Sequence, residues 1–455
     1  MDRLLIKNAL IATDSELFAG DLLAENGLIA DYGTALTAQD ARVIDAKGKY
    51  LLPGGVDPHT HFDLDVGFDR ASDDFYTGGI AAACGGTTSV IDHMAFGPKH
   101  CALTHQIGVY HELAKTCVID YGFHGVLQHV DSGVLQDMEK LPEKGITSLK
   151  YYLTYDYRLD DADALRVMER AKELGLTLCV HCENDAILHR MREKYLAEGH
   201  TQPRFHPLSR PAWAESEAVY RSIALANTVG GVTLYIVHLS SRLGAQAAHT
   251  ARHAGQSKVY LETCPQYLFL HDDLYMDDKE GLKYILAPPL RKPQDSQALW
   301  KSIQNGEIDT LGTDHCPFFF SSQKQRGKDD FTKTPNGMPG VELRLSLLFS
   351  EGFLAGKLSL PEMVRLCCTR PAEIFGIAPQ KGNIQRGADA DLVLFDPDIS
   401  WTVHHRDLHE NTDYTPYEGM QLQGKPVMTL SRGEVIVENG RFLGQKGRGR
   451  YLMRR

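Results

Sequence analysis

Eight apolar, β-rich runs recur through the middle of this 455-residue chain, and longer stretches with helical character separate them. Segments rich in Ala, Leu and charged residues, such as 160–174 and 212–227, are expected to be helices. Continuous apolar strands that alternate with helices indicate a parallel sheet buried on both faces. Eight such units predict an α/β fold of the (β/α)8 TIM-barrel type. A doubly wound open sheet is the alternative, but no glycine-rich phosphate loop follows any run. The runs are Leu51–His61, Thr87–His93, Val118–His129, Ser148–Tyr155, Leu176–Cys182, Thr233–Ser240, Lys258–Cys264 and Ile308–His315.

Both ends of the chain have a different character, with short apolar bursts and frequent turns. Bursts at 4–6, 22–24 and 28–30 precede or follow turn residues, and Asn26-Gly27 is a strong signal for a two-residue hairpin. Beyond about residue 378 the same style returns, with strand candidates at 382–384, 390–395, 427–430 and 434–437. We therefore expect residues 1–52 and 379–455 to form one small β-sandwich domain, with the barrel at 53–378 inserted between them. The basic tail at 446–455 is expected to be a solvated or subunit-contacting arm.

Composition narrows the class of protein. The net charge of −11 disfavours a nucleic-acid binder, which needs a basic surface. The nine cysteines are thinly spread and have no framework spacing, which fits a reducing compartment. No apolar run approaches the roughly 20 residues of a membrane span, and the first residues lack the pattern of a signal peptide. These features predict a cytoplasmic protein with no membrane partner.

Ionisable side chains gather at the ends of the predicted barrel strands, where barrel enzymes carry their functional groups. His59 and His61 end the first run, and residues two apart on a strand share a face. Imidazoles with a carboxylate and no thiolate suit zinc, with manganese and iron as alternatives. The sequence therefore predicts a metal site at this end of the barrel. The remaining candidates on later runs are Lys150, His181, His238 and Asp314.

Lys150 is at first sight out of place, because a lysine would repel metal ions. It becomes useful if its amine reacts with carbon dioxide, since the resulting carbamate is an anion able to bridge two metals. The alternative is an exposed lysine in a surface ion pair. Cys179 and Cys182 form a C-x-x-C, but the two sulfurs face opposite ways on a strand and no second pair follows. Three further residues, which either support the ligands or belong to loops, are Asp92, His93 and His129.

Together these residues resemble the amidohydrolase superfamily, and within it the cyclic amidohydrolases of the hydantoinase/dihydropyrimidinase family, D-hydantoinases (phenylhydantoinases) in particular. The resemblance covers essentially the whole chain and its motifs are specific. Beside the six residues above, the matching segments are 53–61 (PGGVDPHTH), 83–88 (ACGGTT), 149–155 (LKYYLTY), 262–267 (ETCPQY), 335–342 (PNGMPGVE), 381–382 (KG) and 389–391 (DAD).

The resemblance implies a binuclear centre with two divalent metal ions per subunit. His59, His61 and Asp314 would bind the more buried ion. His181 and His238 would bind the second. Lys150, as N6-carboxylysine, would bridge the pair together with a hydroxide.

The resemblance also implies how the substrate is held. Tyr155 would point at the substrate carbonyl, and main-chain groups at Ala287 and Asn336 would grip the ring amide. Many relatives carry Ser at position 287, a difference that matters little if the contact is made by the main chain alone. Asp314 would act both as a ligand and as the group that passes a proton to the leaving nitrogen.

The implied reaction is metal-dependent hydrolysis of the cyclic amide bond of 5-substituted hydantoins or dihydropyrimidines, which gives N-carbamoyl amino acids. The implied partner is a small-molecule substrate, and the implied assembly is a homotetramer. Dihydroorotase-like relatives carry an Arg just after the second histidine to pair with a substrate carboxylate. Phe62 occupies that position here, which argues against dihydroorotase activity.

A pocket for the exocyclic substituent of the ring is expected on the segments that follow the first, second and fourth strands. Several aromatic side chains there favour a bulky or aromatic substituent, although they could simply cover the barrel mouth. Two other functions stay open: allantoinase-type ring opening, and a non-catalytic scaffold of the kind in which metal ligands have been lost. All six ligand positions are occupied here, which disfavours the scaffold. The predicted pocket residues are Leu64, Phe68, Phe96 and Tyr152.

Overall fold

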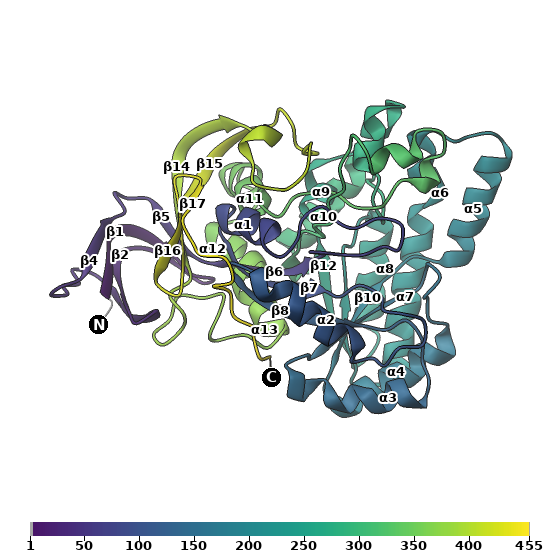
Figure 1. Cartoon of the computed structure of the whole chain (residues 1–455), viewed down its shortest axis with the longest axis horizontal. Coiled ribbons are helices and arrows are strands. Elements are labelled where there is room, and N and C mark those ends of the chain that lie inside the picture. Colours follow the sequence, from purple (N-terminus) through teal and green to yellow (C-terminus); the bar gives the residue numbers. More distant parts are fainter. Residues whose placement is uncertain (1–2, 455) are drawn as a thin grey trace.

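The computed structural model describes residues 3–454, which form a parallel β-barrel and a second sheet beside it (Figure 1). The barrel has eight parallel strands, and their order around the barrel is their order along the chain. Each of the eight predicted apolar runs contains one barrel strand, so the predicted (β/α)8 architecture is confirmed. The strands are β6 (Gly55–Thr60), β7 (Thr87–His93), β8 (Asp120–Val126), β9 (Ser148–Tyr152), β10 (Thr177–His181), β11 (Thr233–Ile236), β12 (Lys258–Thr263) and β13 (Thr310–Leu311).

The first and last strands meet at the end that carries the predicted ligands. The amide of Asp314 donates to the carbonyl of His59 at 2.9 Å, and the amide of His61 donates to the carbonyl of His315 at 2.9 Å. The buried carboxylate of Asp57 accepts the hydroxyl of Thr313 at 2.7 Å. These contacts close the barrel nearly completely and fix the two strand ends relative to each other.

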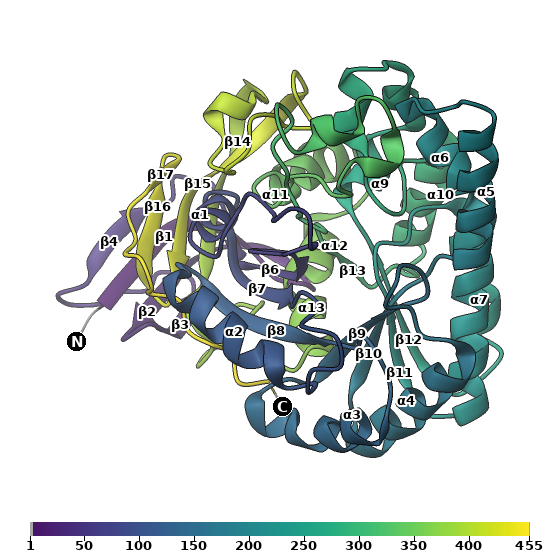
Figure 2. The same cartoon turned by 45° about the vertical axis from the view of Figure 1, so that its right-hand side comes forward.

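Helices surround the barrel strands (Figure 2). The predicted helix at 160–174 is α4 (Asp161–Leu174): the side chain of Asp160 accepts the amide of Asp163 at 2.8 Å at its start, and Gly175 ends it with φ 67°. The prediction at 212–227 corresponds to α7 (Ala212–Val229). Among the described residues no helix is both long and apolar enough to cross a membrane. The other helices are α1 (Thr77–Cys84), α2 (His105–Leu113), α3 (Ser132–Asp137), α5 (Asp185–Ala197), α6 (His206–Ser209), α8 (Arg242–Arg252), α9 (Pro265–Phe269), α10 (Pro293–Gln304), α11 (Arg344–Leu348), α12 (Leu360–Val364) and α13 (Arg370–Ile374).

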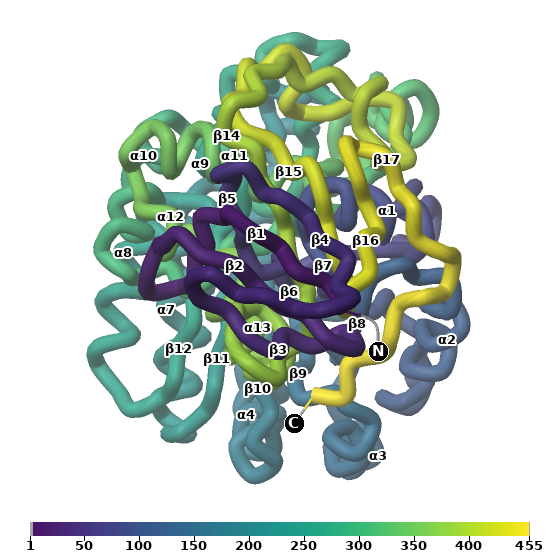
Figure 3. The backbone as a smooth tube through the Cα atoms, turned by 90° about the vertical axis from the view of Figure 1, so that its left-hand side faces the viewer, coloured from purple at the N-terminus to yellow at the C-terminus, as the bar shows by residue number. Residues whose placement is uncertain are grey.

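The second sheet is built from both ends of the chain, as predicted (Figure 3). It is mostly antiparallel, and β5 from the N-terminal part pairs with β14 from the C-terminal part. Its apolar side chains form a core cluster of their own. At the predicted hairpin, Asn26 and Gly27 both have positive φ, 52° and 84°, as a tight turn of this kind requires. The strands are β1 (Arg3–Ala12), β2 (Leu17–Glu25), β3 (Leu28–Gly33), β4 (Arg42–Asp45), β5 (Tyr50–Pro53), β14 (Leu392–Thr402), β15 (Gln421–Ser431), β16 (Glu434–Glu438) and β17 (Arg441–Phe442).

Two details of the strand prediction were wrong. The run at 51–61 is two strands in different sheets, because β5 ends at Pro53 and β6 begins at Gly55. Residues 382–384 form no strand: Gly382 has φ 78°, and its carbonyl accepts the hydroxyl of Thr369 at 2.9 Å. The side chain of Ile384 is nevertheless buried in the core of the second sheet.

The basic tail is not a solvated arm along its whole length. Residues 449–454 run back along the barrel, where the amide of Leu452 donates to the carbonyl of Tyr121 at 2.7 Å. Arg454 is 1% exposed, and its guanidinium donates to the hydroxyl of Ser148 at 2.8 Å and to the carbonyl of Phe123. Residue 455 lies outside the described residues.

Candidate active site

Three of the predicted ligands converge at the junction of the first and last strands. Nε2 of His59 lies 3.1 Å from Oδ1 of Asp314, and Nε2 of His61 lies 3.2 Å from the same oxygen. One candidate ligand atom from each of the three residues lies within 4.8 Å of the other two. This geometry is suited to holding a cation between two imidazoles and a carboxylate.

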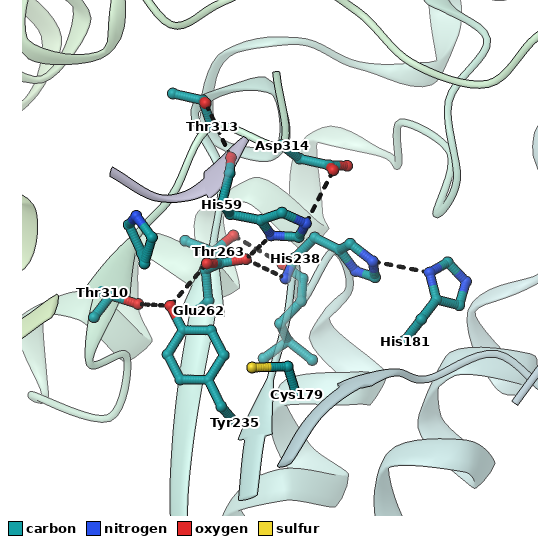
Figure 4. A network of polar contacts seen from close by, with 12 residues as sticks. His59, Cys179, His181, Tyr235, His238, Glu262, Thr263, Thr310, Thr313 and Asp314 are labelled. Atoms are coloured by element: carbon teal, nitrogen blue, oxygen red, sulfur yellow. Dashed lines mark hydrogen bonds and ion pairs between the residues drawn. The ribbon is translucent and has the colours of Figure 1, made fainter. Parts of the chain in front are cut away.

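Two further predicted ligands, His181 and His238, lie next to His59 and Asp314 (Figure 4). Nε2 of His238 faces Nδ1 of His181 at 2.9 Å, and the ring of His238 is stacked on that of His59 with centroids 5.5 Å apart. Nζ of Lys150 lies 3.4 Å from Nε2 of His59, so this lysine is buried within the cluster and not in a surface ion pair. The structure therefore brings together all six predicted ligands, which come from five strands or strand ends.

A buried carboxylate that the sequence analysis did not single out holds two of these histidines. Glu262 accepts Nδ1 of His59 at 2.6 Å and the amide of His238 at 2.9 Å, and the hydroxyl of Tyr235 donates to it at 2.7 Å (Figure 4). A carboxylate on the far nitrogen of a ligating imidazole fixes the ring and its tautomer. The signal was present in the sequence, because Glu262 opens the matching segment ETCPQY on an otherwise apolar strand.

Glu183 holds His181 in a similar way. Its carboxylate lies 2.8 Å from Nε2 of His181, which leaves Nδ1 facing His238. Arg210 binds both oxygens of Glu183 through its guanidinium. Burial acts to raise the pKa of Glu183, but Arg210 and His181 outweigh it and hold that pKa below its usual value. Glu183 follows His181 by two residues, a spacing that could have indicated it.

Burial and charge set the protonation of the central groups. Burial lowers the pKa of Lys150, which favours the neutral amine that carbamate formation requires. Burial acts to raise the pKa of Asp314, but the neighbouring His59 and His61 lower it well below its usual range. Asp314 is thus ionised and able to accept a proton.

Three of the predicted site residues have left-handed backbone conformations. Tyr155 has φ 71°, His238 has φ 41° and Asp314 has φ 54°. Such φ values are uncommon for residues other than glycine and persist where the surroundings impose them, often at functional sites. Each of the three lies two or three residues after the carboxyl end of a barrel strand.

A comparison of the chain with protein-family models agrees with the barrel and with the group of metal-ligand side chains. The model of the Amidohydrolase family matches residues 50–436, well over half of the chain. The chain belongs to the amidohydrolase family. The family implies a binuclear metal centre, and His59, His61 and Asp314 form a group here that could hold a metal ion.

Full-length relatives indicate which kind of amidohydrolase the chain is similar to. This amidohydrolase is 48% identical over 455 residues to the D-phenylhydantoinase of Escherichia coli O1:K1 / APEC, an alignment that covers 100% of this chain and 98% of the relative. It superposes on the crystal structure of dihydropyrimidinase from Brevibacillus agri NCHU1002 with a TM-score of 0.97 at 44% identity, over 99% of this chain and 98% of that one. It also matches the L-hydantoinase (dihydropyrimidinase) from Arthrobacter aurescens with a TM-score of 0.90 at 30% identity, over 100% of both chains. The amidohydrolase is therefore an enzyme of the cyclic amidohydrolase type, and these relatives do not favour the allantoinase or scaffold alternatives.

Tyr155 lies beside the second pair of histidines in this amidohydrolase. Its ring centroid is 5.5 Å from that of His181, and the Arg210 guanidinium carbon lies 5.8 Å from the Tyr155 ring centroid. Burial raises the pKa of Tyr155 to about 12, although Arg210 opposes this shift. The phenol thus keeps its proton at neutral pH and can donate a hydrogen bond.

Two of the residues predicted to line a substituent pocket, Phe96 and Tyr152, lie against each other. The rings of Phe96 and Tyr152 lie 5.3 Å apart, and Tyr152 is 5.9 Å from Tyr155. Tyr157, which the sequence analysis did not name, joins them with its ring 4.4 Å from Phe96. Phe68 is 57% exposed. Leu64, the fourth predicted residue, is half-buried.

Main-chain groups at Ala287 and Asn336 are free, unlike those of their neighbours. The carbonyl of Leu286 accepts Nε2 of His206 at 2.7 Å, and the carbonyl of Pro288 accepts the hydroxyl of Tyr267 at 2.8 Å. Within residues 3–454, neither the amide nor the carbonyl of Ala287 or Asn336 has a hydrogen-bond partner. Both residues were predicted to bind substrate through the main chain, and both have main-chain groups available.

The remaining candidates have structural surroundings. Asp92 accepts the hydroxyl of Thr60 at 2.7 Å and the amide of Phe62 at 2.8 Å, and so ties the first two strands together. Phe62 itself is fully buried against Phe75. His93 packs against the ligands, with its ring 4.4 Å from that of His59.

The C-x-x-C residues do not form a pair. Cys179 lies in an interior cluster with Tyr235, whereas Cys182 contacts the hydroxyl of Ser222 at 3.7 Å. Both thiols are free and buried. The lack of a bond between them fits the expectation that the two sulfurs face opposite ways. His129 is outside the ligand group and lies 3.6 Å from Asp131.

Proposed function

We propose that this amidohydrolase opens the ring of 5-substituted hydantoins or dihydropyrimidines and releases N-carbamoyl amino acids. The observation that carries the proposal is the convergence of six side chains, four imidazoles, one carboxylate and one amine, at the carboxyl ends of the barrel strands. The relatives at 48% and 44% identity, a D-phenylhydantoinase and a dihydropyrimidinase, support the choice of ring.

The donor set fits two divalent cations. Nε2 of His59 and His61 together with Oδ1 of Asp314 form one half-site, and Nδ1 of His181 with Nε2 of His238 forms the other. Both His59 and His181 have a carboxylate on the nitrogen that faces away from the site, the arrangement typical of metal-ligating histidines.

We further propose that Lys150 carries a carbon dioxide-derived carbamate and that the ions are zinc, with manganese or iron as alternatives. The lowered pKa of Lys150 supports the carbamate, because the neutral amine is the form that reacts with carbon dioxide. The imidazole-rich donor set supports a transition metal over magnesium or calcium. When bound, the ions would polarise the amide carbonyl and make water acidic enough to attack near neutral pH.

The protein's own groups would handle the oxyanion and the proton. Tyr155, protonated at neutral pH, would donate its hydroxyl to the carbonyl oxygen as negative charge develops there. Asp314, an ionised carboxylate, would accept a proton from the attacking water and deliver it to the departing ring nitrogen. Arg210 and Glu183 would keep Tyr155 and His181 in place.

The unpaired main-chain groups of Ala287 and Asn336 would bind the ring amide. A cyclic amide or imide presents an N–H donor beside carbonyl acceptors, which free main-chain carbonyls and amides complement. Because the main chain makes these contacts, the Ala found where many relatives have Ser leaves them intact. The aromatic cluster of Phe96, Tyr152 and Tyr157 would lie against an aromatic substituent.

Three further properties are part of the proposal. The nine free cysteines support a reducing compartment, such as the cytoplasm. A homotetramer is the assembly that the resemblance implies. The change of sheet between Pro53 and Gly55 supports a domain limit near residue 52, with a second limit near 378.

A turnover panel tests the proposal. The metal-loaded enzyme is given hydantoin, both enantiomers of 5-phenylhydantoin, dihydrouracil and allantoin, and ring opening is followed by the appearance of the N-carbamoyl product. We expect turnover of the hydantoins or of dihydrouracil. A preference for allantoin would replace the proposed substrate class. Less than about one divalent ion per chain after reconstitution with bicarbonate would refute the binuclear site.

A further inference from the structure

Lys324 is a fully buried lysine that no step of the proposed reaction uses. Its residue is 0% exposed, and its Nζ donates to three main-chain carbonyls: Ile285 at 2.7 Å, Pro335 at 2.9 Å and Gly337 at 2.6 Å. The three acceptors come from two segments about fifty residues apart in the chain. One side chain therefore joins two stretches of main chain that the fold brings side by side.

The hydrogen-bond count indicates that Lys324 is charged. Three acceptors require three N–H groups, which an ammonium supplies and a neutral amine does not. Burial lowers the pKa of Lys324 to about 7, and Cys316 opposes that shift. The three carbonyl acceptors favour the cationic form of the side chain. Within residues 3–454 no carboxylate lies at ion-pair distance, and the ring of Phe318 lies 6.0 Å from Nζ. The positive charge is thus balanced mainly by main-chain dipoles. The position of the ammonium therefore depends on the three carbonyls, and the positions of the carbonyls depend on the ammonium.

The carbonyls that Lys324 binds flank the residues proposed to hold the ring amide. Ile285 lies two residues before Ala287, while Pro335 and Gly337 lie on either side of Asn336. The amide of Gly337 also donates to the carbonyl of Ile285 at 3.0 Å, which fixes the spacing of the two segments directly.

The same segments lie next to the metal-ligand end of the barrel. The amide of Cys316, two residues after Asp314, donates to the carbonyl of Met338 at 3.0 Å. A displacement of either segment would therefore change the distance between the ring-amide contacts and the reacting carbonyl.

We propose that Lys324 is a positioning residue for substrate binding, whose ammonium holds the segments of Ala287 and Asn336 at the spacing that the ring amide requires. This inference rests on the proposed function and deepens it, because it names the side chain that organises the main-chain contacts. Lys324 does not touch the substrate itself.

The test compares Lys324→Met, which keeps the length and removes the donors, with Lys333→Met as a matched control. The Lys333 side chain is 70% exposed and lies on the same stretch of chain. Ground and transition states share the ring-amide contacts, so we expect Lys324→Met to raise KM for the ring substrate by about tenfold or more while kcat changes by less than about threefold. Metal content should equal that of the wild type, and Lys333→Met should behave as the wild type in every respect.

Amide hydrogen exchange provides a readout that is independent of activity. Loss of the ammonium should speed exchange at Gly337, whose amide bonds to Ile285, by about tenfold or more relative to the wild type and to Lys333→Met. A Lys324→Met enzyme with a lower Tm but unchanged KM and unchanged exchange at Gly337 would overturn the inference and leave a purely structural role. Should Lys324→Met fail to fold, Lys324→Gln is judged by the same two measurements.

The two proposals fail in different ways. A wild-type enzyme that opens none of the cyclic amides would overturn the proposed function. Faster exchange at Gly337 in Lys324→Met would still support the role of Lys324 in holding the two segments together. A wild-type enzyme that turns over hydantoins, with no change of KM in Lys324→Met, would overturn only the role of Lys324.

Discussion

Replacement of Glu262 by Gln tests whether the carboxylate behind the ligands tunes the metal centre. Gln has nearly the same shape, and its amide oxygen can still accept Nδ1 of His59, now 2.6 Å from the carboxylate. Its NH2 group would face the hydroxyl of Tyr235, which lies 2.7 Å from Glu262 and 2.6 Å from Thr310. That hydroxyl can rotate to accept from Gln and donate to Thr310, so the hydrogen-bond network survives while the negative charge is lost.

The charge matters because it makes His59 more basic. Burial favours the neutral imidazole, but Glu262 and Asp314 together outweigh this effect and raise the pKa of His59 to about 9. Loss of a carboxylate in this position typically weakens metal binding or activity by about 10- to 100-fold. Each tenfold step corresponds to about 1.4 kcal/mol, so we expect a loss of about 1.4 to 2.8 kcal/mol in metal-binding free energy.

The assay is competition of the holoenzyme against a graded series of chelators, followed by kcat/KM after full metal loading. Tyr235→Phe is the matched control, because it removes one hydrogen bond from Glu262 but keeps the carboxylate and the contact to His59. We expect the control to lose less than about tenfold, since a single neutral hydrogen-bond donor contributes about 1 kcal/mol. Metal affinity and kcat/KM in Glu262→Gln equal to those of the wild type would refute the tuning role.

Three other variants have defined outcomes. Lys150→Ala should lose the bridging anion and with it activity and part of the bound metal, measured by elemental analysis; full activity in this variant would exclude the carbamate. Tyr155→Phe should lower kcat by about 100- to 1000-fold with little change in metal content, because one donor to the oxyanion is removed; an unchanged kcat would exclude this role. Lys381→Met should destabilise the fold by about 3–5 kcal/mol, because Lys381 is buried against Asp120, Asp389 and Asp391. Burial acts to raise the pKa of Asp120, but Lys381 and Arg432 lower it below 3.8. The wild type should therefore keep this stabilisation above about pH 4 and lose it as the pH falls through the lowered pKa of Asp120. Urea unfolding between about pH 5 and pH 3 should show a smaller loss of unfolding free energy in Lys381→Met than in the wild type. An equal dependence of the two unfolding free energies on pH would contradict this prediction.

The barrel and most of the ligand set could be predicted because the signals are local in the sequence. A buried parallel strand is a continuous apolar run, and an H-x-H pair on such a strand places both imidazoles on one face. His59, His61, Lys150, His181 and Asp314 each lie in or directly after one of these runs. The strands' carboxyl ends meet at one rim of the barrel, so residues spread over 255 positions of the chain were expected to converge.

The sequence alone also determined that the two chain ends share a sheet, from their common pattern of short strands and turns. It placed the limit between the two domains at residues 52 and 53, but it did not show that the run at 51–61 is two strands, because their different pairing partners separate them. The buried position of Arg454 could not be predicted either, because a basic tail has the composition of a solvated arm. Only the folded chain shows that the guanidinium of Arg454 donates to the main-chain carbonyls of Gly145 and Phe123.

Only the tertiary structure decided which groups support the site. Glu262 acts through the far nitrogen of His59 and Arg210 acts through Glu183, so neither is marked by a spacing that predicts its contact. Glu183 differs, because it lies two residues after the histidine that it holds. The free main-chain groups of Ala287 can be recognised only in the folded chain, where the carbonyls of the two adjacent residues have hydrogen-bond partners. Lys324 looks like one basic residue in a charged loop, and its three acceptors come from segments that meet only in the folded chain. Periodicity along the chain encodes which face of an element is buried, whereas hydrogen bonds between distant segments depend on distances that only the packed barrel sets.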